Sequence, residues 1–133
     1  MNANDVRYLI VGGFALSFHA QPRFTKDLDF FIDSSPDNCE KLIKALADFG
    51  FSELDLAAED FSAPDKVVQL GIAPVRIDIL TSIDGVGFSE AWEQKIEGRY
   101  DTEKAWFISR EMLLRNKLAS GRTRDLADAE LLR

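Results

Sequence analysis

The segment DLDFFI, residues 27–32, places two carboxylates inside an otherwise apolar run. Aspartate is depleted from β-strands. Side chains alternate between the two faces of a strand, so Asp27 and Asp29 would share one face with their Cα atoms roughly 6 to 7 Å apart. That spacing lets both carboxylates bind one divalent ion, or a pair of ions about 3.5 to 4 Å apart. Mg²⁺ favours one or two protein carboxylates together with substrate phosphates, and such a site would explain two charges on this strand.

A third carboxylate, Asp78, occurs in the apolar stretch VRIDIL. Each acid also has an ordinary explanation at a protein surface. The first two could pair with nearby basic residues such as Arg23 and face solvent, and Asp78 could pair with Arg76 on the same face of its strand. Three carboxylates on two short apolar strands favour a metal site over these separate surface pairs.

A pair of glycines, Gly12 and Gly13, separates an apolar run from the start of a helical pattern in LIVGGFALSF. Glycines at this point let the backbone approach a ligand, and free N–H groups at a helix start bind anions. The alternative is a tight turn that needs positive φ. The stretch matches neither G-x-G-x-x-G nor G-x-x-x-x-G-K-[ST], so it supports neither a dinucleotide-binding fold nor a P-loop.

Hydrophobic periodicity predicts a single α+β domain over residues 1–133, with a mixed β-sheet and helices packed on it. A hairpin between the third and fourth strands interrupts any purely parallel scheme, and residues 51–65 have no regular pattern beyond a possible short edge strand. Ser35 is expected to cap a helix that begins at Pro36 and stops at Gly50, and Ser89 to cap the next helix. Strands are predicted at 6–11, 27–33, 66–72, 75–83 and 104–109, and helices at 14–20, 36–50, 88–98, 109–121 and 122–133.

Composition limits the partners of the chain. Hydrophobic residues make up 46% and charged residues 29% of 133 residues, as in ordinary globular proteins. The net charge of −7 argues against extended binding to duplex nucleic acid, which depends on cationic side chains. A single cysteine, Cys39, excludes an intrachain disulfide, and no apolar stretch approaches the roughly 20 residues of a membrane span. The cytoplasm is the expected location.

The combined pattern resembles the nucleotidyltransferase superfamily typified by DNA polymerase β. The stretch VGGFALSFHAQPRFTKDLDFFI is most similar to small bacterial proteins related to the AbiEii toxins and to aminoglycoside nucleotidyltransferases. The tail KLASGRTRDLADAELL is similar to the closing segment of the AbiEii-like group. The resemblance covers most of the chain and implies a minimal nucleotidyltransferase fold.

The resemblance also implies a reaction and its residues. Gly12 and Gly13 would cradle nucleotide phosphates, and Asp27, Asp29 and Asp78 would hold Mg²⁺ or Mn²⁺. Asp78 would also be a candidate for activating the incoming hydroxyl. That hydroxyl, on an acceptor that is RNA, protein or a small molecule, would attack the α-phosphorus of an NTP, and pyrophosphate would leave.

Four further residues carry weaker expectations. Arg23 and Lys117 would bind the triphosphate, and Thr25 and Asp125 are possible contributors. Thr25 could equally be the entry to a strand, and Asp125 could belong to a solvated helix. The chain lacks the long C-terminal domain of larger relatives, so a partner protein or a homodimer could complete the site. The alternative function is a non-catalytic, nucleotide-binding or antitoxin-like module of a toxin–antitoxin pair.

Overall fold

The computed structural model describes residues 5–20, 27–48, 57–70, 76–100 and 103–133. The strands are β1 (Tyr8–Val11), β2 (Asp27–Ile32), β3 (Val67–Leu70), β4 (Arg76–Leu80), β5 (Ile96–Tyr100) and β6 (Glu103–Phe107). The helices are α1 (Gly12–His19), α2 (Pro36–Leu46), the 3₁₀ helix η3 (Ala58–Phe61), α3 (Phe88–Glu93), α4 (Arg110–Ser120) and α5 (Thr123–Leu132).

The strands form one mixed sheet in the order β3-β4-β2-β1-β6-β5. Strand β1 pairs antiparallel with β2 and parallel with β6, and β2 pairs parallel with β4. The pairs β3–β4 and β5–β6 are antiparallel and occupy the two ends of the sheet. This mixed sheet with packed helices confirms the predicted α+β class.

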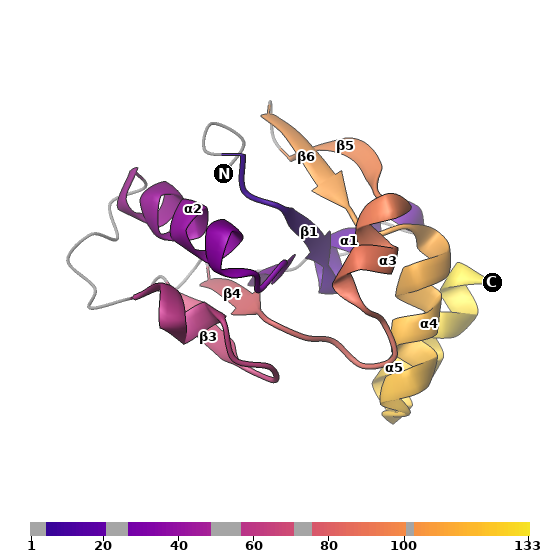
Figure 1. Ribbon diagram of the computed structural model, residues 1–133. Coiled ribbons are helices and arrows are strands. Elements are labelled where there is room, and N and C mark those ends of the chain that lie inside the picture. The colour runs from indigo at the N-terminus through magenta and orange to yellow at the C-terminus, as the bar shows by residue number, and fades with distance from the viewer. Residues whose placement is uncertain (1–4, 21–26, 49–56, 71–75, 101–102) are drawn as a thin grey trace.

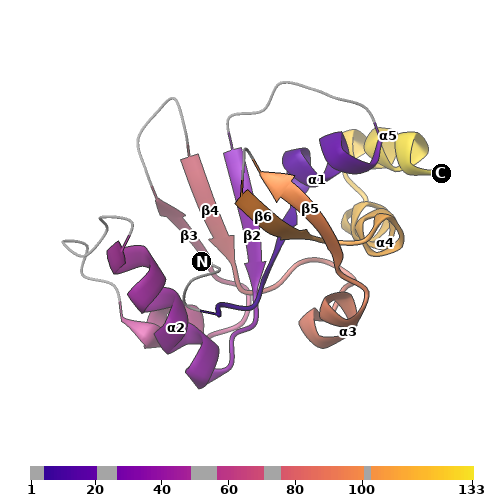
Figure 2. The same cartoon turned by 90° about the horizontal axis from the view of Figure 1, so that it is seen from above.

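The helices gather in two places. Helix α2 lies with η3 at one end of the molecule, and α4 and α5 lie together at the other end (Figures 1 and 2). The side chain of Ser109 caps α4 by accepting a hydrogen bond from the Met112 N–H at 3.1 Å. Gly121 ends the helix in a left-handed conformation, with φ of 69°, so the predicted split between the two closing helices is confirmed.

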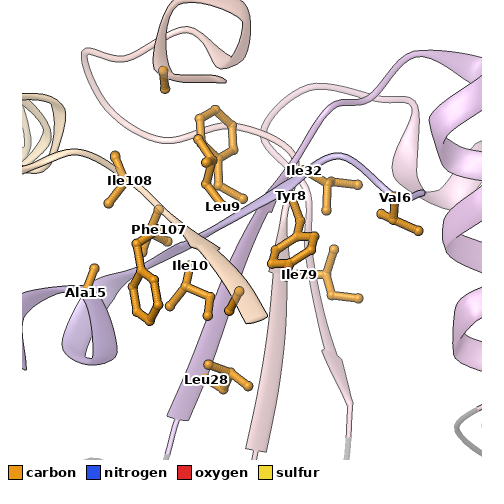
Figure 3. Close-up of a cluster of buried hydrophobic side chains, with 14 of the residues drawn as sticks. Val6, Tyr8, Leu9, Ile10, Ala15, Leu28, Ile32, Ile79, Phe107 and Ile108 are labelled. Atoms are coloured by element: carbon orange, nitrogen blue, oxygen red, sulfur yellow. The ribbon is translucent and has the colours of Figure 1, made fainter. Parts of the chain in front are cut away.

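The core is centred on β1, whose four residues are all buried. Figure 3 shows Tyr8, Leu9 and Ile10 among apolar side chains from the neighbouring strands. Tyr8 contacts the ring of Phe30 edge to face at 5.4 Å, and Ile10 is the register partner of Phe107 on β6. Because β1 is covered on both sides, it reads as a continuous apolar run in the sequence.

One predicted helix is wrong in its second half. Residues 88–98 were expected to be helical throughout, but α3 ends at Glu93 and a strand begins at Ile96. That strand pairs along its whole length with β6, and a Cβ atom on Gly98 would lie within 2.9 Å of the rings of Phe18 and Phe107. Tertiary pairing therefore overrides the local helical pattern. The N-cap position of α3 is Gly87 and not Ser89.

The remaining elements follow the predictions with small differences. Pro36 is the first residue of α2, as expected, but the hydroxyl of Ser35 donates to Asp33 instead of capping the helix. The predicted stop at Gly50 lies outside the described residues, as does the turn between β3 and β4. The described part of the irregular segment, 57–65, contains η3 and turns and no strand.

Candidate active site

Asp29 and Asp78 are direct neighbours across the parallel strands β2 and β4. The register pairs Asp29 with Asp78, and two positions earlier it pairs Asp27 with Arg76. Partner residues in adjacent strands project from the same face of a sheet. The sheet thus brings together two carboxylates that are 49 positions apart in the sequence. Asp27, two residues before Asp29, projects from the same face of β2.

This arrangement changes the acidity of Asp29. Burial raises the pKa of its carboxyl to about 7, assisted by the charge of Asp78, a hydrogen bond with Asp78 and the charge of Asp27. The positive charge of Lys117 acts in the opposite direction. The metal-free protein therefore holds Asp29 partly protonated near neutral pH, because burial and the negative charge of Asp78 both disfavour its ionised form.

The oxygens of this pair are suited to a divalent cation. Oδ1 of Asp78 is buried and has no hydrogen-bond partner within the described part of the chain. Native proteins rarely leave a buried carboxylate oxygen unpaired, so this atom is a candidate ligand. Among the described residues, no three His, Cys, Asp or Glu side chains come close enough to enclose an ion by themselves. An open donor set of this kind fits Mg²⁺, which completes its shell with water and phosphate oxygens.

The glycine turn lies directly against these acids. Gly12 has φ of 68°, which confirms the need for positive φ, and a Cβ atom at this position would overlap Oδ2 of Asp29. Gly12 is also the first residue of α1, and no side chain caps that helix start. The backbone N–H groups at the start of α1 therefore lie near the carboxylates, where a phosphate and its metal ion would meet.

Lys117 and Asp125 belong to a buried ionic network between α4 and α5. The ammonium nitrogen of Lys117 lies 3.2 Å from Asp125 and 3.4 Å from Asp128. Asp125 also accepts hydrogen bonds from Ser120 at 2.6 Å and from Arg122 at 2.7 Å. Only 2% of Asp125 is exposed, so the interpretation of this residue as part of a solvated surface is wrong.

The network fixes the charge of Asp125. Burial by itself would raise the pKa of this carboxyl, but hydrogen bonds from Ser120, Arg122 and Lys117, with the charge of Lys117, lower it to about 2. Asp125 is consequently ionised at any physiological pH, and it forms charge-assisted bonds to both helices.

A cavity of about 450 Å³ connects the two groups of residues. It brings together six of the residues expected from the sequence, and their side chains or backbone line it: Gly12, Gly13, Asp27, Asp29, Lys117 and Asp125. Asp78 is beside Asp29 but does not line the cavity. Arg23 and Thr25 lie outside the described residues. The cavity therefore unites the first half of the predicted site with its C-terminal part.

Comparison with protein families gives one match that spans nearly the whole chain. Residues 3–132 match the family described as "Nucleotidyl transferase AbiEii toxin, Type IV TA system". The chain belongs to the AbiEii family. No curated protein matches the chain. In the described residues, no helix has the length and apolar character needed to cross a membrane. Membership of the AbiEii family supports nucleotidyltransferase activity in general and a place in a toxin–antitoxin system.

Sequence reasoning missed several residues of this AbiEii cavity. The most informative is Asp128, which follows Asp125 by three positions and therefore shares its helix face. This spacing of three residues could have identified Asp128 as a site residue from the sequence. The other missed polar and charged lining residues are Ser82, Asp84, Asn116, Ser120, Arg122 and Arg124. Ser82 and Asp84 follow β4, and only the fold brings that connection to the α4–α5 junction.

Proposed function

We propose that this AbiEii-family protein transfers a nucleoside monophosphate from an NTP to a hydroxyl group of an acceptor, and that the reaction requires Mg²⁺ or Mn²⁺. The observation that carries the proposal is the Asp29–Asp78 pair, held against the Gly12 turn at one end of a cavity. A pair of acids beside a helix start that no side chain caps suits a metal-bound triphosphate.

The charges that line the cavity support a metal requirement. Five carboxylates and three cationic side chains line it, so it is negative before any ligand enters. A triphosphate would add several more negative charges to the same space. Divalent cations would offset this repulsion, because at short range in a partly buried site like charges interact strongly.

In this proposal each group has a definite role. Asp27, Asp29 and Asp78 would contribute ligands to a divalent cation, which would supply charge stabilisation for the attacking and leaving oxygens. The backbone N–H groups of Gly12 and Gly13 bind phosphate oxygens. Positioning of the two reactants supplies the rest of the catalysis.

The transfer forms one bond to the α-phosphorus and breaks another. The acceptor hydroxyl gives up its proton, for which Asp78, beside the Asp29 end of the cavity, is the candidate base, and the hydroxyl oxygen forms a bond to the α-phosphorus. The bond between the α-phosphorus and the bridging oxygen breaks, and pyrophosphate leaves. Arg23 remains a proposed contributor to triphosphate binding, and Thr25 and Asp125 remain possible contributors to the site. Lys117, which was expected to bind the triphosphate, is paired with two carboxylates and supports the site through that network.

The cellular setting is also a proposal. The family description as a type IV toxin supports an antitoxin partner, and the cytoplasm would provide both NTP and acceptor. The acceptor is RNA, protein or a small hydroxylated molecule. A homodimer remains a second way to complete the acceptor side of the site.

Thermal unfolding in the presence of ligands tests the proposal. We would measure the melting temperature with ATP, GTP, CTP or UTP, each with and without Mg²⁺ or Mn²⁺, for the native chain, Asp29→Asn and the control Asp37→Asn. Asp37 is exposed on α2, away from the cavity. We expect stabilisation only with metal and nucleotide together, because a ligand specific for the folded state raises its stability. The control should retain this stabilisation and Asp29→Asn should lose it. An unchanged response in Asp29→Asn, or no response in the native chain, would refute the proposal.

A further inference from the structure

The positive side chains of the cavity all come from one wall. Among the described residues that line it, the cations are Lys117, Arg122 and Arg124, at the end of α4 and the start of α5. The described lining residues of β2 and of the connection after β4 include carboxylates and no cation. An anionic group that extends away from the Asp29 end would therefore be attracted to the α4–α5 junction.

Two of these three cations already have carboxylate partners in the protein, Lys117 in the buried network and Arg122 at its exposed edge. Lys117 is 8% exposed and lies between Asp125 and Asp128, at 3.2 and 3.4 Å. Arg122 donates through Nε to Asp125 at 2.7 Å. Two positive and two negative groups thus balance one another. Moving Lys117 onto a phosphate would leave two buried carboxylates with less compensation, which is costly.

Arg124 differs from its two neighbours. It is exposed, it lines the cavity, and it makes no hydrogen bond or ion pair with another described residue. Its charge is therefore available to a ligand. The planar guanidinium group can donate two parallel hydrogen bonds to a phosphate, which a lysine cannot do.

We infer that Arg124 binds the terminal phosphates of the substrate, whereas Lys117 is a positioning residue that holds α5 against α4 through Asp125 and Asp128. This inference rests on the proposed function and names the subsite of the phosphates that leave as pyrophosphate. The rigid network keeps the first turn of α5 in place, so the Arg124 side chain is presented to the cavity at little entropic cost.

Direct binding measurements test the inference apart from catalysis. Calorimetry would compare Mg²⁺–ATP and Mg²⁺–tripolyphosphate binding to the native chain, Arg124→Ala, Arg124→Lys and Arg133→Ala. Arg133 follows α5, pairs with Glu130, and does not line the cavity, so it is the matched control. Arg124→Ala should weaken binding of both probes about tenfold, equivalent to about 1.4 kcal/mol, and Arg124→Lys by a smaller factor. Thermal stability without ligand should stay unchanged in both variants.

The outcomes separate this inference from the proposed function. If the native chain binds Mg²⁺–ATP and Arg124→Ala binds both probes as well as Arg133→Ala does, the inference is wrong and the proposed function stands. If the native chain binds neither probe, both are overturned. A selective loss in Arg124→Ala, with Arg133→Ala unaffected, would assign the phosphate subsite to the α4–α5 junction.

Discussion

Gly12 lies so close to the carboxylate of Asp29 that the position has no room for a side chain. A Cβ atom on Gly12 would overlap Oδ2 of Asp29, and its Cγ atom would be 3.2 Å away. The turn that starts α1 therefore packs directly against the strand that carries Asp29, next to the register pair Val11–Asp29. A glycine is required here both for its positive φ and for its missing side chain.

Gly12→Ala should lower the free energy of unfolding by roughly 2 to 4 kcal/mol, because alanine adds the cost of a left-handed backbone to a steric overlap. Urea denaturation measures this change. Gly87→Ala is the control, since a Cβ atom there meets nothing within 4 Å. The double variant Gly12→Ala/Asp29→Ala should recover the part of the loss that comes from overlap. Equal losses at both glycines would contradict the close contact.

Asp29→Asn should stabilise the metal-free protein at and above neutral pH. The pKa of Asp29 is raised from 3.8 to about 7, so between these values the folded state binds more protons than the unfolded state. Stability of the native chain therefore falls as the pH rises through this window. After a discount for solvent screening, we expect an advantage of roughly 1 to 2 kcal/mol for the variant above pH 7 and little below pH 4.

Urea denaturation in a chelating buffer at pH 4, 6 and 8 checks this pH dependence. Asp37→Asn is again the control, because Asp37 is an exposed acid on α2. A stability difference between Asp29→Asn and the native chain that does not change with pH would show that the Asp29 carboxyl is not destabilised by its neighbours.

Lys117→Met should cost about 3 to 5 kcal/mol of stability, because it leaves Asp125 and Asp128 buried without their shared cation. Thermal or urea unfolding measures the loss. Lys41→Met removes an exposed pair with Asp37 and should change stability by less than about 1 kcal/mol. Adding Asp125→Asn and Asp128→Asn to Lys117→Met should restore part of the loss. A mild effect of Lys117→Met alone would argue against the buried network.

Acid should weaken the α4–α5 contact over a defined pH range. The pKa of Asp125 is lowered from 3.8 to about 2, so its contribution is present above pH 4 and is lost as the pH falls toward 2. We expect about 2 kcal/mol from this group. Asp125→Asn should be less stable than the native chain at pH 5, and the two should converge near pH 2. A constant difference between the two proteins across this range would contradict the lowered pKa.

The local parts of the site were predictable from the sequence. Strand alternation places Asp27 and Asp29 on one face of β2 without any knowledge of the fold, and the glycine pair marks the start of α1. The pairing of Asp29 with Asp78 was not predictable in this way, because it depends on which strands are neighbours and in what register. Several alternative sheets would have separated these two acids.

The errors have related causes. Residues 96–98 were assigned to a helix because a short amphipathic pattern continues through them, and only the presence of β6 as a partner makes them a strand. The interpretation of Asp125 as solvated rested on its charge. Its burial depends on Lys117 from another helix, and a sequence window does not show that the two will face each other. In both cases an interaction with another element decided the structure: strand pairing with β6 for residues 96–98, and the ion pair with Lys117 for Asp125.

The position of β1 in the sheet has a consequence for synthesis of the protein. Ile10, near the beginning of the chain, is the register partner of Phe107 on β6, and the cavity is lined by residues between Val11 and Asp128. A ribosome must therefore deliver the α4–α5 segment before the central strand is fully paired and before the cavity exists. A nascent chain therefore has no assembled cavity until the α5 segment has emerged from the ribosome.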